Sequence, residues 1–118
     1  MTKIFVVDDH KLFASGLAGL LEDDLPGADI AVFADVESGL AAMADSPPDI
    51  VLLDFYLPGV SGVEAIKSVR AAAPGVKVII ISASLSPADR QISEGAGAAA
   101  FLAKSSDPDE VVAAITAI

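Results

Sequence analysis

Apolar runs alternate with amphipathic segments along the chain, and the alternation repeats five times. The apolar runs span residues 4–7, 30–33, 50–53, 76–81 and 99–103. Three of them consist almost entirely of Val, Ile, Leu and Phe, whereas the last is mostly Ala. Nearly continuous apolar runs of this length are typical of strands that are buried on both faces in a parallel sheet. The pattern therefore predicts five buried strands.

Helix signals stand between the predicted strands. The start signals are Ser61 with Glu64, Asp107 with Glu110, and Ser86 followed by Pro87 and Asp89. The first two have the spacing of a capping box, and Pro108 suits the first helical position. Two earlier helices are marked by the apolar stripe Phe13, Leu17, Leu20 and Leu21 before Pro26 and Gly27, and by Leu40 and Met43 between Asp35 and the pair Pro47–Pro48. Strict strand–helix alternation predicts a doubly wound α/β fold with five parallel strands and five helices.

The predicted helix over residues 87–94 differs from the others, because Ile92 is its only large apolar residue. A helix with so narrow an apolar stripe packs weakly, and its position can shift at small cost. We therefore expect it to be an element that moves.

Composition narrows the class of protein. The 118 residues suit one domain, and 53% hydrophobic residues suffice for a buried core. No apolar run approaches the roughly 20 residues that span a membrane, and the N-terminus lacks the pattern of a secretory signal. The absence of cysteine excludes disulfides and thiolate metal sites and weakly favours the cytoplasm. A net charge of −10 argues against direct binding of nucleic acid by this domain and is compatible with a cation or a basic partner.

Polar residues stand at the carboxyl ends of four of the predicted strands. Asp8 and Asp9 follow the first strand, Asp54 the third, Ser82 the fourth and Lys104 the fifth. In a doubly wound sheet these ends share one edge, where ligands bind. We therefore expect three carboxylates, a hydroxyl and an ammonium group in one crevice.

Clustered carboxylates repel one another unless a cation joins them. Mg²⁺ prefers oxygen ligands and binds through one or two carboxylates together with phosphate and water oxygens, and Mn²⁺ accepts the same ligands. With a metal bound, Asp54 can stay ionised and act as a nucleophile towards phosphorus. Lys104, the Ser82 hydroxyl and the backbone N–H of Ala83 can then neutralise or bind the phosphoryl oxygens.

Each of these residues also has a purely structural interpretation. Asp9 could cap a helix, Ser82 and Asp54 could form turns, and Lys104 could be solvated. Their joint placement at four strand ends favours the functional interpretation. His10, the only histidine, is expected in the loop before the first helix, where it caps that helix.

Four stretches resemble, in order, the signature regions of the response-regulator receiver family. They are "VVDDH", "DIVLLDFYLPGVSGVEAI", "VIIISA" and "GAGAAAFLAK", and the resemblance covers essentially the whole chain, residues 1–118. It implies a CheY-like, flavodoxin-like sheet with the strand order 2-1-3-4-5.

The resemblance also implies roles for the acidic residues. Asp54 would be the phosphorylated aspartate, Asp9 would bind Mg²⁺ directly, and Asp8 would bind it mainly through water. The backbone carbonyl of Tyr56 would complete the metal site.

The other family roles concern the phosphoryl group and the switch. Ser82 and Lys104 would contact the phosphoryl group, and Phe101 would swing inward as Ser82 moves towards it. Many members have Tyr at this switch position, so Phe101 departs from the family pattern by lacking a hydroxyl. A bulky side chain at Tyr56 is a candidate shield against hydrolysis.

The stretches "VVDDHKLFASGLAGLL" and "FLAKSS" look most like the NarL/FixJ subgroup, whose receivers precede a LuxR-type DNA-binding domain. That subgroup lacks the Pro that many receivers have after the lysine, and Ser105 stands there in this chain. The resemblance implies phosphorylation by a sensor histidine kinase, a homodimer through the fourth and fifth helix region, and transcriptional output through a DNA-binding domain that the chain does not contain.

Alternative functions remain open from the sequence. The chain could be a stand-alone receiver that acts through protein–protein contacts, or a receiver-like scaffold that is never phosphorylated. A Mg²⁺-dependent aspartyl phosphohydrolase is disfavoured, because such enzymes carry an acid two residues after the nucleophile, where Tyr56 stands. A flavin or nucleotide module is disfavoured, because Asp8 and Asp9 would repel phosphate. We therefore expect a regulatory domain rather than an enzyme.

Overall fold

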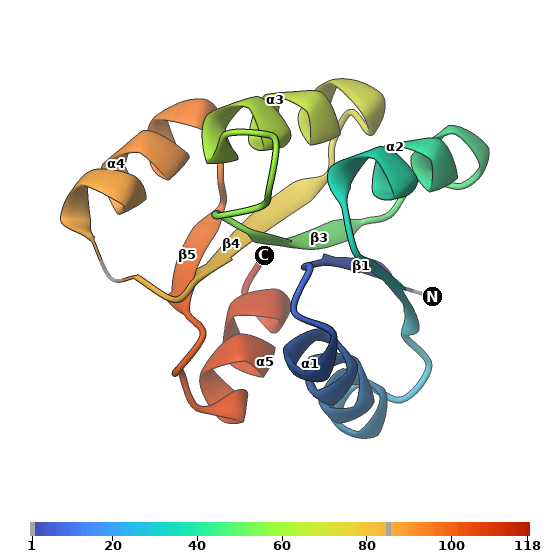
Figure 1. The fold of residues 1–118 in the computed structure, drawn as a ribbon. Coiled ribbons are helices and arrows are strands. Elements are labelled where there is room, and N and C mark those ends of the chain that lie inside the picture. Colours follow the sequence, from blue (N-terminus) through green and yellow to red (C-terminus); the bar gives the residue numbers. More distant parts are fainter. Residues whose placement is uncertain (1, 85) are drawn as a thin grey trace.

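The computed structural model describes residues 2–84 and 86–118, in which five strands and five helices alternate (Figure 1). The strands are β1 Lys3–Val7, β2 Asp29–Phe33, β3 Ile50–Asp54, β4 Lys77–Ser82 and β5 Ala100–Ala103. The helices are α1 Lys11–Asp24, α2 Val36–Asp45, α3 Gly62–Ala72, α4 Pro87–Ala96 and α5 Pro108–Thr116. All strand pairs are parallel, and the order β2-β1-β3-β4-β5 confirms the predicted sheet.

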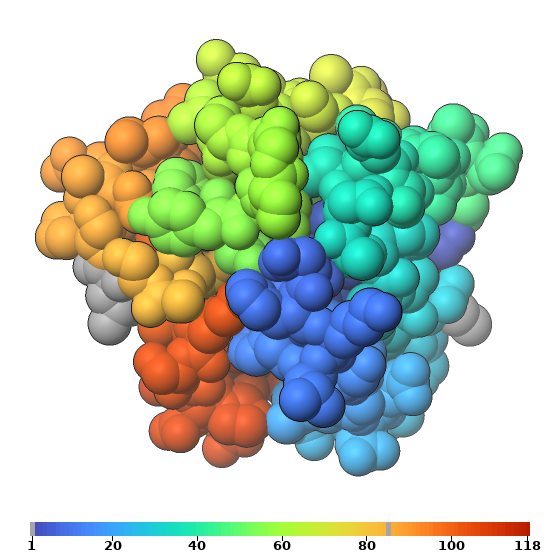
Figure 2. Space-filling view, in the orientation of Figure 1, coloured from blue at the N-terminus to red at the C-terminus, as the bar shows by residue number. Residues whose placement is uncertain are grey.

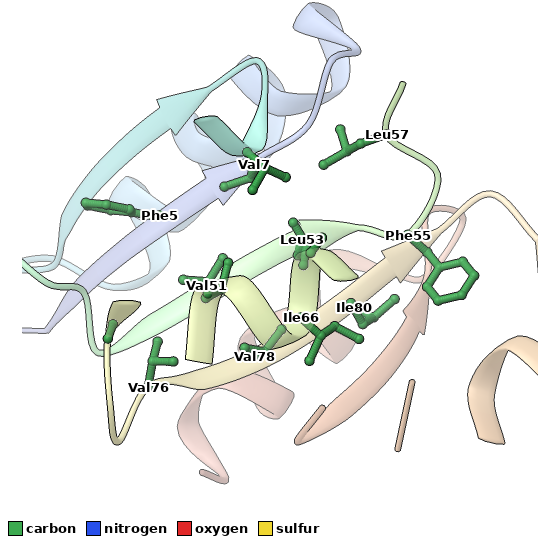
Figure 3. Close-up of a cluster of buried hydrophobic side chains, with 14 of the residues drawn as sticks. Phe5, Val7, Val51, Leu53, Phe55, Leu57, Ile66, Val76, Val78 and Ile80 are labelled. Atoms are coloured by element: carbon green, nitrogen blue, oxygen red, sulfur yellow. The ribbon is translucent and has the colours of Figure 1, made fainter. Parts of the chain in front are cut away.

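Helices cover both faces of the sheet, with α2, α3 and α4 on one side and α1 and α5 on the other (Figure 1). Because side chains alternate along a strand, each central strand contributes to two apolar clusters. In β3, Val51 and Leu53 pack towards the first cluster, with Ile66 of α3 (Figure 3). Ile50 and Leu52 belong to the second cluster, which includes residues of α1 and α5. This two-sided burial explains why the central strands are continuously apolar.

The predicted helix starts are mostly confirmed. Ser61 accepts a hydrogen bond from the backbone N–H of Glu64 at 3.1 Å, and Ser86 accepts one from Asp89 at 3.4 Å. The expected capping box at Asp107 is wrong, because its side chain makes no capping bond. The N–H of Glu110 instead donates to the backbone carbonyl of Asp107 at 2.9 Å, so this donor is already satisfied.

Helix α4 has the narrow apolar face that its sequence predicts. Ser93 is the only fully buried residue of this helix, whereas Ile92 is half-exposed. A helix that buries so little apolar surface gains little packing energy, which favours a low cost of displacement. No helix among residues 2–84 and 86–118 is long and apolar enough to cross a membrane.

Two leucines of α1 provide a matched test of the packing. Leu21 is 0% exposed in the second cluster and Leu12 is 92% exposed. Leu21→Ala should lower the free energy of unfolding by about 2–5 kcal/mol, because it leaves a cavity. Leu12→Ala on the same helix should change it by less than about 0.5 kcal/mol. Urea denaturation followed by circular dichroism measures both values, and equal losses would contradict this description of α1.

Candidate functional site

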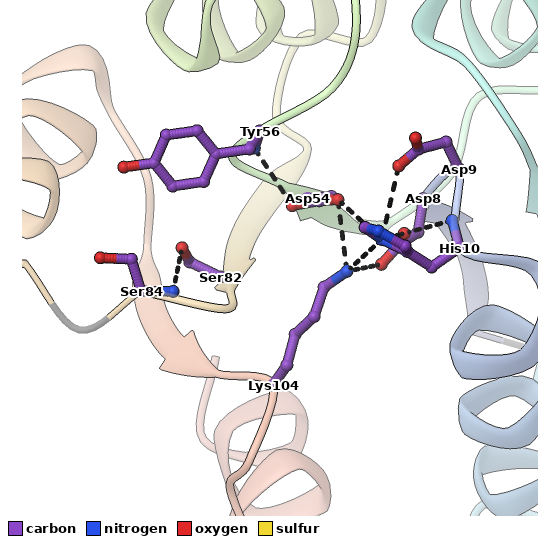
Figure 4. Close-up of polar contacts among 8 residues, drawn as sticks. All are labelled: Asp8, Asp9, His10, Asp54, Tyr56, Ser82, Ser84 and Lys104. Atoms are coloured by element: carbon purple, nitrogen blue, oxygen red, sulfur yellow. Dashed lines mark hydrogen bonds and ion pairs between the residues drawn. The ribbon is translucent and has the colours of Figure 1, made fainter.

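The carboxyl ends of the parallel strands bring the predicted site residues together. Val7 pairs with Leu53 across β1 and β3, so the residues that follow them, Asp8 and Asp54, are adjacent (Figure 4). Ser82 pairs with Ala103 across β4 and β5. Figure 2 shows the same edge from outside, where the blue start of α1, the green segment after β3 and the red segment before α5 gather on one face.

Lys104 bridges the two buried carboxylates. Its Nζ lies 2.9 Å from Asp8 Oδ2 and 3.3 Å from Asp54 Oδ2. Both aspartates are only 3% exposed, and the lysine side chain is 15% exposed. The ammonium group also lies 4.8 Å from the centre of the Phe13 ring. These contacts exclude a solvated lysine and make Lys104 the nearest cation to Asp54.

Asp9 has the free ligand atom that a metal site needs. Its Oδ1 is buried, and among the described residues it has no hydrogen-bond partner. Asp8 differs, because its Oδ1 accepts the N–H of His10 at 2.8 Å and its Oδ2 faces Lys104. Ligand atoms from Asp8, Asp9, His10 and Asp54 all lie within 4.8 Å of one another. A buried, unpaired carboxylate oxygen in such a group fits a hard divalent cation such as Mg²⁺.

His10 lies where the sequence predicts, directly before α1, but its side chain makes no capping bond. His10 is the N-cap residue of α1, as predicted, and its backbone carbonyl accepts the N–H of Ala14 at 2.9 Å. The imidazole turns into the acidic cluster instead, with Nδ1 3.1 Å from Asp8, 3.5 Å from Asp9 and 3.6 Å from Asp54 (Figure 4). The negative potential of three carboxylates supplies the physical reason for this orientation. Sequence analysis missed this residue as a member of the site, although its position directly after Asp8 and Asp9 was a usable signal.

The Ser82 hydroxyl is buried but does not face Asp54. Its Oγ accepts a hydrogen bond from the N–H of Ser84 at 3.1 Å (Figure 4). Ala83 follows directly, and within residues 2–84 and 86–118 no hydrogen bond from its N–H is formed. On the other side of Asp54, the N–H of Tyr56 donates to Oδ1 at 3.1 Å. The structure thus unites Asp8, Asp9, His10, Asp54 and Lys104, while the Ser82 hydroxyl belongs to the following loop.

Phe101 is already inside the protein. Its ring is buried, packs edge-on to Phe55 at 6.4 Å and lies 5.6 Å from the guanidinium carbon of Arg90. Arg90 also donates to the Phe101 carbonyl at 3.4 Å. The ring of Phe101, the predicted switch residue, therefore points inward in this structure.

Tyr56 connects the site to α4. Its hydroxyl donates a hydrogen bond to the carboxylate of Asp89, in the first turn of that helix. This bond raises the pKa of Tyr56 above its ordinary value. The half-exposed ring thus covers the side of the site that faces α4, a contact that the sequence could not reveal.

Burial is the main influence on the pKa of Asp54. Loss of solvent raises the pKa of its carboxyl group above the ordinary aspartate value, and Asp8 adds to the rise. The N–H of Tyr56 and the charge of Lys104 oppose it. A divalent cation would favour the ionised form, which is the nucleophilic one.

The sequence matches the response regulator receiver domain model over residues 4–116. The chain belongs to the response-regulator receiver family. The receiver is 34% identical to the glycerol metabolism activator of Pseudomonas putida over 122 residues, and 33% identical to the response regulator UvrY of Escherichia coli over 122 residues. Each alignment covers 100% of this chain and 54% of the relative, so the chain spans about half the length of these curated relatives.

A solved two-component response regulator of the LuxR family from Aurantimonas sp. SI85-9A1 resembles the receiver in structure. It is 34% identical, has a TM-score of 0.89, and the match covers 99% of this chain and 84% of that one. The subgroup that the opening and "FLAKSS" stretches predict is therefore confirmed. The relatives are named as regulators rather than enzymes, which agrees with a regulatory domain.

The raised pKa of Asp54 gives a stability prediction for the metal-free receiver. The folded protein binds this proton more tightly than the unfolded chain, so stability is lost as the pH rises through the raised pKa. Asp54→Asn resembles the protonated form and should raise Tm at pH 7 in the presence of EDTA. The gain should vanish below the ordinary aspartate pKa of about 3.9, where both states are protonated.

The exposed Asp23 in α1 provides the control for this measurement. Asp23→Asn removes the same charge far from the cluster and should leave Tm nearly unchanged. Thermal melts at several pH values compare the variants. A lower Tm for Asp54→Asn at pH 7 would contradict the assigned direction of the pKa shift.

Proposed function

We propose that this receiver is a phosphorylation-dependent switch of a two-component system, in which Asp54 accepts a phosphoryl group from a sensor histidine kinase or a small phosphodonor. The observation that carries the proposal is the pairing of a buried Asp54 with Lys104 at 3.3 Å, beside the unpaired Oδ1 of Asp9. A carboxylate nucleophile, a fixed cation and a free metal ligand are the parts that phosphoryl transfer to an aspartate requires.

The roles of the acidic residues follow from their contacts. Asp9, Asp54 and the carbonyl of Tyr56 would hold Mg²⁺ directly, and Asp8, already bonded to His10 and Lys104, would act mainly through water. The bound ion would neutralise charge on the phosphoryl oxygens and keep Asp54 ionised. Mn²⁺ offers the same chemistry.

Lys104 and the β4–α4 segment would hold the phosphoryl group. Lys104 needs no large movement, because its Nζ already contacts the acceptor carboxylate. The N–H of Ala83 and the hydroxyl of Ser82 would donate to the remaining oxygens. Ser82 Oγ accepts the N–H of Ser84, and its hydroxyl hydrogen remains available to donate.

The β4–α4 segment offers a route from the site to α4. The N–H of Ser84 donates to Ser82 Oγ, that of Ser86 donates to Ser84 Oγ at 3.3 Å, and that of Asp89 donates to Ser86 Oγ. When Ser82 turns towards the phosphoryl group, it withdraws the first acceptor of this series. The weakly packed α4 is then the element whose position changes, and Phe101 follows the same movement from its buried position.

The output would be exerted through protein contacts made by α4, β5 and α5. We propose that phosphorylation favours a homodimer through the α4, β5 and α5 region, and that transcription is controlled by a LuxR-type DNA-binding domain outside residues 1–118. The net charge of −10 agrees with DNA binding by a separate domain rather than by the receiver. Such a system operates in the bacterial cytoplasm, where its kinase domain and DNA lie.

Incubation with Mg²⁺ and acetyl phosphate tests the acceptor. Intact-mass spectrometry should show a single phosphate adduct on the wild-type protein and none on Asp54→Asn, because the nucleophile is removed. Asp23→Asn should keep the adduct. Lys104→Ala should slow its formation roughly 100-fold, since charge stabilisation of this kind is typically worth about 2.7–4 kcal/mol. Phosphorylation of Asp54→Asn at wild-type level would refute the proposal, as would turnover of the donor that persists in Asp54→Asn.

The ring of Tyr56 allows a separate test of phosphoryl lifetime. Tyr56→Asn should speed hydrolysis of the phosphorylated protein, because a small side chain admits water to the site. Tyr56→Phe keeps the ring but removes the bond to Asp89, so it separates shielding from that bond. Decay of the adduct, followed by mass after removal of the donor, should be faster in Tyr56→Asn than in Tyr56→Phe. Equal decay of Tyr56→Asn and wild type would eliminate the shielding role.

A further inference from the structure

Lys104 reaches the acidic residues from a strand that does not adjoin theirs. It follows β5, whereas Asp8 follows β1 and Asp54 ends β3, and β4 lies between β3 and β5. Its Nζ nevertheless lies 2.9 Å from Asp8 Oδ2 and 3.3 Å from Asp54 Oδ2 (Figure 4). A lysine has a flexible four-carbon stem, so holding it in one direction costs side-chain entropy. Contacts along the stem or at the ammonium group must offset this cost.

Lys104 lines a groove of about 280 Å³ between α1 and α5. The lining also includes Phe13 and Leu20 of α1 and Val111 of α5. Among the described residues of this lining, Lys104 alone is charged. Only 15% of the lysine side chain is exposed, so apolar neighbours cover its stem while its ammonium group meets the carboxylates. An apolar groove shields the stem but does not by itself fix the direction of the charged end.

Phe13 supplies a directional contact in this groove. Lys104 Nζ lies 4.8 Å from the centre of its ring, within the about 6 Å over which a ring face attracts an ammonium group. The ring is half-buried and packs against the second apolar cluster, so its place is fixed by the packing of α1. A carboxylate in this place would compete with Asp54 and with a phosphoryl group for the same ammonium group. A neutral ring attracts the cation without forming such a competing ion pair.

We propose that Phe13 is a positioning residue for Lys104, because the face of its ring holds the ammonium group beside the acceptor carboxylate of Asp54. The inference rests on the proposed phospho-acceptor function and adds a residue of α1 to it. Phe13 takes no part in bond formation and acts through Lys104 alone. Without the ring, the lysine stem samples other directions, and the ammonium group spends a smaller share of the time beside Asp54. An incoming phosphoryl group then meets a less ordered cation, which slows the transfer.

Nuclear magnetic resonance of the full 118-residue protein tests the contact without any phosphoryl chemistry. The face of an aromatic ring shifts nearby protons upfield, so the Hε protons of Lys104 should resonate upfield of those of the other lysines. Phe13→Leu should abolish this shift, because it keeps an apolar side chain and removes the ring. Phe13→Tyr keeps the ring face and should retain the shift. Lys104 Hε resonances at the same position in the wild type and in Phe13→Leu would overturn the proposal.

Phosphorylation by acetyl phosphate and Mg²⁺ measures the consequence for the reaction. Intact-mass spectrometry should show that Phe13→Leu forms the adduct roughly 3- to 30-fold more slowly than the wild type, the range expected from a cation–π contact. Phe13→Tyr should react at nearly the wild-type rate, since its ring offers the same face. Leu20→Ala is the matched control, because Leu20 lines the same groove without a ring, so the variant should lose stability and keep the rate. Circular dichroism checks that each variant folds.

A double-mutant comparison separates positioning from a general packing role. In the Lys104→Ala background, Phe13→Leu should cause no further slowing, since the ring acts only through that lysine. A further slowing of the same size there, or a slowing by Leu20→Ala equal to that by Phe13→Leu, would overturn the proposal. A wild-type adduct at Asp54 with an equally fast Phe13→Leu variant would remove the role of Phe13 and leave the phospho-acceptor function intact. A wild-type protein that forms no adduct would instead refute that function, and the inference with it.

Discussion

Repulsion among three carboxylates at one edge of the sheet is the constraint on which this structure depends. Asp8 and Asp54 are buried side by side, where water screens their charges poorly. Within the described chain, Lys104 and the ring of His10 are the groups that fill the space between them. Burial, and to a smaller extent Asp8, raises the pKa of Asp54. The buried Oδ1 of Asp9 has no hydrogen-bond partner among the residues that the structure describes. The site would therefore gain stability from binding a cation, because the ion would offset the repulsion among the carboxylates.

The sheet and the positions of its strand ends could be predicted because both follow from local chemistry. Continuous apolar runs identified the central strands, and a parallel sheet brings its carboxyl ends to one edge whatever the helices do. Asp8, Asp54 and Lys104 were therefore placed correctly by their position in the sequence alone. The Ser61 cap was also predictable, since its donor lies three residues away.

The features that the sequence could not predict depend on side-chain direction or on distant partners. The capping role expected of Asp107 failed because a backbone carbonyl satisfied the donor first. The ring of His10 followed the electrostatic field of the cluster rather than the adjacent helix end. The Ser82 hydroxyl accepts a hydrogen bond from the N–H of Ser84 in the loop that follows it. The Tyr56 hydroxyl donates to the carboxylate of Asp89, 33 positions later in the sequence. In each case the hydrogen-bond partner of the side chain depends on competition among groups that only the folded chain brings together.

In the proposed switch, helix α4 is the element through which a local charge change would have a distant effect. Several polar contacts hold it. The N–H groups of Ser86 and Asp89 donate to Ser84 and Ser86, and the Tyr56 hydroxyl donates to Asp89. Arg90 donates to the Phe101 carbonyl, and Arg70 of α3 donates to the carbonyl of Ala96. Reversing a two-state equilibrium from 1:99 to 99:1 takes about 5.5 kcal/mol. Charge-assisted bonds to a phosphoryl group contribute about 1.5–3 kcal/mol each, so two or three of them match that requirement. An apolar helix anchored in the core would cost far more to move. In the proposed switch, the polar sequence of α4 would keep two positions of the helix close enough in energy for one phosphoryl group to shift the balance between them.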